Sequence, residues 1–245
     1  MPAETTPPRR KLHLVRWMVV VFIVVSAWGG WRVVALRSAL KEARALGWTV
    51  IYTDPAEEMW KNWKAAFEKE TWTDGVRYVN IPVGREGMEH TGIVQRLNPR
   101  NLRIDKADGI RDLSAFERLG RLEGLWFNEA TDLRNIDSLG TLPALRAVGI
   151  TGSRELGDFE VLSRLQGLVS ITLRACPKLK NADVLGSIGT LRLVQLEGCS
   201  GLTDVNALLR LPSMEGIHLG DCWGVPAAQF GELRSAFPNA VITGP

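Results

Sequence analysis

Apolar residues recur with a fixed spacing of 23 residues over the segment 76–245. In the clearest copy, Leu168 is followed by Ile171, Leu173 and Cys176. The next two copies hold Leu191, Val194, Leu196 and Cys199, and then Met214, Ile217, Leu219 and Cys222. The three preceding copies hold Leu145, Val148 and Ile150; Leu122, Leu125 and Phe127; and Pro99, Leu102 and Ile104. The series starts with Val76, Val79 and Ile81 and continues without a shift to Phe237, Ala240 and Ile242. One continuous helix or strand cannot produce this spacing, so it predicts a solenoid of stacked coils.

Each coil has a strand half and a helical half. In the first half, apolar positions alternate with polar ones, which is the period-two pattern of a short strand. In the second half, apolar residues are three apart, as in Leu133, Ile136, Leu139 and Leu142, which suits short helical or 3₁₀ turns. The predicted fold is α/β, with a curved parallel sheet of up to eight strands on the concave side and helical segments on the convex side.

The motif L-x-x-L-x-L-x-x-C-x-x-L, with a downstream aspartate as in Leu202-Thr203-Asp204, resembles the repeats of leucine-rich-repeat proteins. It is most similar to the bacterial internalin-like and cysteine-type repeats. Five full copies with degenerate ends cover residues 76–245. The resemblance implies a leucine-rich-repeat solenoid.

A single transmembrane signal anchor is predicted before the repeats, at residues 17–36. Residues 17–31 carry no charge, and an extension through Arg32 to Leu36 gives the length that a bilayer requires, provided that Arg32 reaches the interface. Two alternatives remain open: a cleaved signal peptide, with Val25-Ser26-Ala27 as the cleavage site, and a buried helix of a soluble protein.

Charge predicts the orientation of this anchor. The tail 1–16 has four basic residues and Glu4, a net charge of +3 (4 − 1), which equals the net charge of the whole chain. A basic flank favours a cytoplasmic amino terminus, which places the repeats on the extracytoplasmic side of the membrane. The remaining chain has 26 basic and 26 acidic side chains (30 − 4 and 27 − 1), so it shows no footprint for nucleic acid.

Two segments connect the anchor to the repeats. Residues 37–47 are predicted to form a helical juxtamembrane stalk that ends at Gly47. Residues 48–75 are predicted to form an amino-terminal cap, with a strand at 48–53 and an aromatic helix that begins after Asp54-Pro55. This order of anchor, stalk, cap and repeats resembles short membrane-anchored repeat proteins of bacteria.

No catalytic or cofactor motif stands out, so we expect no enzyme and no cofactor. Cys176, Cys199 and Cys222 occupy the inward-pointing repeat position that holds Ala107, Ala130 and Ser153 in earlier coils. We interpret them as buried structural thiols. A metal site is not expected because no histidine or fourth thiol accompanies them, and parallel side chains disfavour a disulfide.

The outward strand positions predict a partner-binding concave face. Its candidate residues are Tyr78, Asn80, Arg103, Asp105, Trp126, Asn128, Thr151, Thr172, Arg174, Gln195, Glu197 and His218. Arg174 and Glu197 lie one coil apart and are predicted to pair. Trp126 either contacts a partner or is covered by Arg103 from the neighbouring coil. The predicted function is a membrane-tethered module that binds a protein or glycan, and the alternative is a structural envelope component that assembles through the solenoid ends or flanks.

Overall fold

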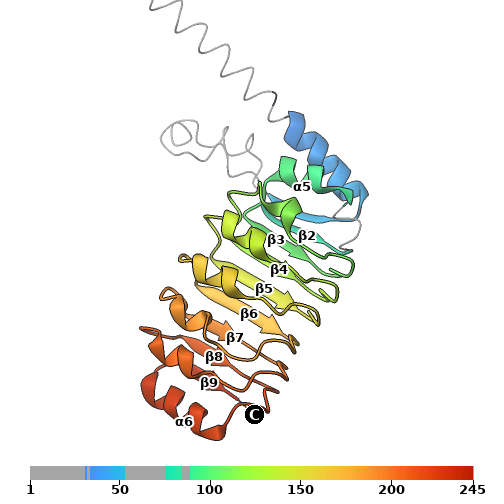
Figure 1. Cartoon of the computed structure of the whole chain (residues 1–245). Coiled ribbons are helices and arrows are strands. Elements are labelled where there is room, and N and C mark those ends of the chain that lie inside the picture. Colours follow the sequence, from blue (N-terminus) through green and yellow to red (C-terminus); the bar gives the residue numbers. More distant parts are fainter. Residues whose placement is uncertain (1–30, 32–33, 53–75, 84–88, 245) are drawn as a thin grey trace, which may run out of the picture.

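The computed structural model describes residues 31, 34–52, 76–83 and 89–244, which form a stack of coils around one nine-stranded sheet (Figure 1). The strands follow one another across the sheet in chain order. They are β1 (Thr49–Tyr52), β2 (Val76–Ile81), β3 (Asn101–Ile104), β4 (Gly124–Phe127), β5 (Ala147–Thr151), β6 (Ser170–Arg174), β7 (Leu193–Gln195), β8 (Gly216–His218) and β9 (Val241–Thr243). β1 pairs with β2 in the antiparallel sense, and the strands from β2 to β9 are parallel.

The 23-residue register is confirmed from β2 to β8. Leu125 pairs with Val148, which pairs with Ile171, and Ile171 pairs with Val194. These side chains point into the core, where each is at most 2 % exposed. The apolar positions of all coils join one continuous hydrophobic cluster.

The prediction that the register reaches the carboxyl end without a shift is wrong in the last coil. Ile217 pairs with Ile242, not with Ala240, so β9 is displaced by two residues. The last coil contains α6 (Ala227–Ala236), an α-helix of 10 residues. Because an α-helix rises about 1.5 Å per residue and a 3₁₀ helix about 2.0 Å, the α-helix needs more residues to span the same distance.

The convex side carries the predicted short helices. One α-helix lies in the first coil, α5 (Thr91–Leu97), and 3₁₀ helices follow in the next five. These are η2 (Ser114–Phe116), η3 (Asp137–Thr141), η4 (Glu160–Arg164), η5 (Leu185–Ser187) and η6 (Asn206–Arg210). Leu139, Leu162, Leu185 and Leu208 occupy one position in successive coils, and all four are buried. The helical half of each coil therefore closes the core from the convex side.

A helix over residues 34–45 lies beside α5 at the amino-terminal end of the stack (Figure 1). Ala39, Leu40 and Ala43 are buried in the common core. The Arg96 guanidinium of α5 donates to Glu42, with 3.1 Å between Nη1 and Oε1. Gly47 ends the helix with φ of 73°, as predicted. The predicted stalk is thus packed against the repeat domain through one face that includes Ala39, Leu40 and Ala43.

Most of the predicted anchor lies outside the described residues, which include only 31 and 34–36 of the segment 17–36. The aromatic helix predicted after Asp54-Pro55 lies outside them as well, whereas β1 confirms the strand predicted at 48–53. In the part of the chain that the structure describes, no helix combines the length and the apolar character needed to cross a membrane.

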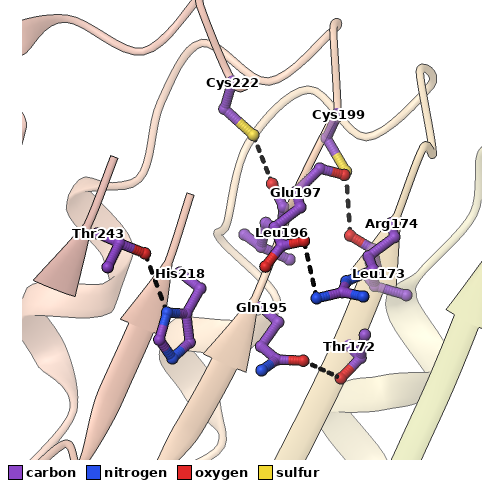
Figure 2. A network of polar contacts seen from close by, with 10 residues as sticks. All are labelled: Thr172, Leu173, Arg174, Gln195, Leu196, Glu197, Cys199, His218, Cys222 and Thr243. Carbon is purple, nitrogen blue, oxygen red and sulfur yellow. Dashed lines mark hydrogen bonds and ion pairs between the residues drawn. The ribbon is translucent and has the colours of Figure 1, made fainter. Parts of the chain in front are cut away.

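The three cysteines are free and fully buried in one column of the core. The Cys199 thiol donates to the Leu173 carbonyl at 3.2 Å, and the Cys222 thiol donates to the Leu196 carbonyl in the same way (Figure 2). Each thiol therefore satisfies a backbone carbonyl from the preceding coil. The interpretation of these cysteines as inward-pointing structural residues is confirmed.

We expect thiol reagents to label the folded protein slowly at neutral pH and to modify all three cysteines rapidly after unfolding. Rapid labelling of the native protein would contradict the burial.

The hydrogen bond with Cys176 is the main cause that raises the pKa of Cys199 to about 12, and the hydrogen bond with Cys199 raises the pKa of Cys222. The folded state then holds these protons more tightly than the unfolded state, whose thiols titrate near 9.0. The contribution of Cys199 to the free energy of unfolding should therefore be lost as the pH rises from about 9 to about 12. Urea melts at several pH values would show a smaller loss of the free energy of unfolding for Cys199→Ala than for the unchanged protein.

Candidate binding surface on the concave face

Three columns of side chains cover the outward face of the sheet, which we call the concave face. The residues of one column occupy the same repeat position in successive parallel coils. The first column includes Tyr78, Asn101, Gly124, Ala147, Ser170, Leu193 and Gly216; the second includes Asn80, Arg103, Trp126, Gly149, Thr172, Gln195 and His218; the third includes Asp105, Asn128, Thr151, Arg174 and Glu197. The structure places every predicted site residue in these columns, because strand alternation directs them away from the core.

Asp105 is the centre of a polar cluster at the amino-terminal end of this face. Its carboxylate accepts hydrogen bonds from Asn80 Nδ2 at 2.8 Å, Arg103 Nε at 2.7 Å and Asn128 Nδ2 at 3.0 Å. Burial acts to raise the pKa of Asp105, but the three hydrogen bonds outweigh burial and hold the pKa below its ordinary value. The cluster thus joins three neighbouring coils around one ionised carboxylate. Beside it, burial raises the pKa of the Tyr78 hydroxyl.

A second polar network covers the carboxyl-terminal half of the face (Figure 2). The Thr172 hydroxyl donates to Gln195 Oε1 at 2.9 Å, and His218 Nδ1 lies 2.9 Å from Thr243 Oγ1. Arg174 Nη2 lies 2.8 Å from Glu197 Oε2, which confirms the predicted pairing across coils. Each contact links neighbouring coils, so the side chains are already oriented by one another.

The charges on the concave face compensate each other. The three columns contain two arginines and two carboxylates among the described residues. Arg103 pairs with Asp105 at 2.7 Å, and Arg174 pairs with Glu197. The face therefore presents hydrogen-bonding groups without a net formal charge.

The Trp126 indole lies flat on the sheet over two glycines. A Cβ atom added to Gly124 would lie 2.3 Å from Trp126 Cη2, and one added to Gly149 would lie 2.3 Å from Trp126 Cδ1. Both distances are shorter than any real carbon contact, so the ring occupies the space that side chains would fill at these positions. The two glycines, both buried, form the seat of a half-buried tryptophan.

Arg103 does not cover this tryptophan. Its guanidinium is drawn to Asp105, and no cation–π contact joins Arg103 to Trp126 in the described residues. The sequence left two alternatives open for Trp126, contact with a partner or cover by Arg103. The structure does not show the second alternative. Within the part of the chain that the structure describes, no aromatic ring or cation lies against the half-buried indole.

Gly124 and Gly149 are parts of the site that were not predicted from the sequence. Gly124 precedes Trp126 by two residues on β4, and Gly149 lies beside Trp126 on β5. A glycine at an outward strand position next to a large aromatic residue is the signal that could have identified them. Thr243 was also missed, because the two-residue shift of β9 brings it beside His218.

The described part of the chain contains no group of three or more His, Cys, Asp or Glu side chains arranged to hold a metal ion. The candidate site is thus an open surface built from one aromatic ring and polar side chains. Such a surface is suited to non-covalent recognition.

No protein-family model matches the chain, and no curated protein matches its sequence. Among solved structures it is similar to the leucine-rich-repeat domain of the type III effector XopL, with 18 % identity over 100 % of this chain and 97 % of that one and a TM-score of 0.46. It is also similar to a leucine-rich-repeat protein of Leptospira interrogans, with 14 % identity, coverage of 62 % and 56 %, and a TM-score of 0.37. Internalin C2 of Listeria monocytogenes matches with 17 % identity, coverage of 67 % and 92 %, and a TM-score of 0.34. The repeat register, the parallel sheet and the convex 3₁₀ helices make the fold of this chain a leucine-rich-repeat solenoid.

Proposed function

We propose that the chain is a membrane-tethered, non-enzymatic binding module that holds a protein or glycan ligand on its concave face. The observation that carries this proposal is the seat of Trp126, where two glycines leave a large aromatic ring flat on an outward surface. Aromatic and arginine side chains supply much of the binding energy in protein interfaces, and a large aromatic ring at an outward strand position is more useful to a ligand than to the core. Around it, the polar networks hold their donors and acceptors in fixed positions.

The rival function, assembly of an envelope structure through the solenoid ends, has less support. At the carboxyl-terminal end, α6 closes the core, where Phe230, Leu233 and Phe237 are at most 8 % exposed. A stacking interface needs an apolar end that another copy can cover. In the last described coil, α6 already covers the apolar core.

Capture of a ligand from cross-linked membranes tests the binding role. We expect Trp126→Ala to weaken capture by more than about 1 kcal/mol, because the variant removes the ring that the site presents. Trp223→Ala is the matched control, since Trp223 is 76 % exposed but lies outside the concave columns. Thermal melts would verify that both variants remain folded. Equal capture by the two variants would argue against the concave face as the binding site.

The proposed topology has the amino terminus in the cytoplasm and the repeats outside it. Single-cysteine reporters at Glu4 and near the carboxyl terminus, in a chain whose native cysteines are replaced by alanine, should be labelled from opposite sides of the membrane. Labelling of both ends from one side, or a mature chain that begins near Trp28, would show that the anchor is not retained.

A further inference from the structure

The Trp126 indole offers one open ring face to a ligand. Its other face lies against the backbone at Gly124 and Gly149, where added Cβ atoms would overlap the ring. The open face has no ring or cation contact among the described residues. A ring fixed in this way loses little conformational freedom when a flat apolar surface stacks on it.

Uncommitted hydrogen-bonding groups lie in the third column, next to the column that contains Trp126. The Thr151 hydroxyl makes no hydrogen bond to any described residue, and it lies on β5 next to the Gly149 position. Asn128 uses its Nδ2 atom to donate to Asp105, which leaves its amide oxygen as an acceptor. Both groups belong to the third column, and each lies two residues after a second-column position, Trp126 or Gly149. A ligand that lies on the ring can therefore exchange hydrogen bonds with neutral groups at its edge.

The charge of the face indicates the charge of its ligand. Both arginines of the columns are paired with carboxylates at 2.7 and 2.8 Å. A charged ligand would have to compete with these ion pairs, whereas a neutral ligand leaves them intact. The complementary ligand is neutral and has hydroxyl groups around an apolar face.

We propose that the concave face binds a neutral glycan, with one hexose ring stacked on Trp126 and its hydroxyls bonded to Asn128 and Thr151. A hexose presents C–H groups on one face and hydroxyls around its rim, which matches a flat indole bordered by amide and hydroxyl groups. This inference rests on the proposed binding function and narrows it to one ligand class. The indole of Trp126 supplies the apolar contact, and the hydrogen bonds to Asn128 and Thr151 orient the hexose.

The first test is calorimetry of the full chain in lipid nanodiscs with maltohexaose, cellohexaose and β-1,4-linked mannohexaose. We expect saturable binding of at least one of these neutral oligosaccharides. Trp126→Ala should weaken it at least about tenfold, and Trp223→Ala should leave it unchanged. Gly149→Ala keeps the tryptophan but displaces its ring, because the new Cβ would lie 2.3 Å from Cδ1. It should therefore also weaken the binding, and added salt should have little effect on the affinity because no charge takes part.

The second test separates this inference from the general binding function. Membranes are treated with mild periodate, which cleaves vicinal diols of glycans, or with protease, and the reagents are removed before capture. Loss of Trp126-dependent capture after periodate supports a glycan ligand, also when none of the three hexasaccharides binds. Capture that survives periodate but is lost after protease overturns the glycan and leaves the binding function in place. Capture that never depends on Trp126 overturns both.

Discussion

Replacement of Leu173 by alanine should lower the free energy of unfolding by about 2–5 kcal/mol, because it removes buried methyl groups and leaves a cavity. Leu173 is fully buried on β6, where it pairs with Ile150 of the neighbouring strand. Every coil contacts the coils before and after it, so a cavity in the middle of the stack weakens two interfaces. Urea melts of the two proteins measure the difference.

Thr172→Ala is the matched control on the adjacent position. Thr172 is half-buried on the opposite side of the same strand, and its hydroxyl makes one hydrogen bond, to Gln195. Loss of that bond should cost about 0.5–1.5 kcal/mol. A larger loss for Thr172→Ala than for Leu173→Ala would mean that the inward and outward positions of β6 have been exchanged.

The repeating part of the fold could be predicted from the sequence because each coil repeats the same physical constraints. Leu125, Val148 and Ile171 are inward-facing for one reason, and three copies of the pattern fix the register better than any single strand could. The last coil breaks this reasoning, because α6 replaces a 3₁₀ helix and moves β9 by two residues. The length of a convex helix is set by packing at the solenoid end, which the repeat pattern does not encode.

The turn that follows each of the strands β4 to β8 illustrates a second limit. Gly152 and Gly198 have φ of 78° and 63°, and Glu129, Ala175 and Asp221 adopt the same left-handed conformation with φ of 55°, 50° and 57°. All five residues occupy one position of successive coils. Glycine is the usual indicator of this conformation, but here the stacked neighbours impose it on three other residue types. The sequence alone therefore does not reveal that the turn is uniform.

The binding surface was predictable in composition but not in arrangement. Alternation within the strands identifies which side chains face outward. Whether Arg103 turns toward Trp126 or toward Asp105 depends on a balance between contacts from three coils, and the carboxylate provides the stronger, charge-assisted hydrogen bond. The flat seat of Trp126 likewise depends on Gly149, which is distant in sequence and adjacent in space.

The helix over residues 34–45 provides the second large expected effect, which distinguishes a docked helix from a free stalk. Ala43→Asp places a carboxylate at a position that is 0 % exposed, inside the common core. An uncompensated buried charge should cost about 3–5 kcal/mol in the free energy of unfolding.

Ala45→Asp introduces the same side chain two residues later, at an exposed position of the same helix, and should change the stability by no more than about 0.5 kcal/mol. Both variants alter the helix propensity and the net charge equally, so the difference between their urea melts reports only the burial of residue 43. Equal stabilities would mean that the helix does not pack on the repeats in solution. A large difference would mean that the segment joined to the predicted anchor is held by the domain itself, so that the repeats cannot swing freely about residues 37–47.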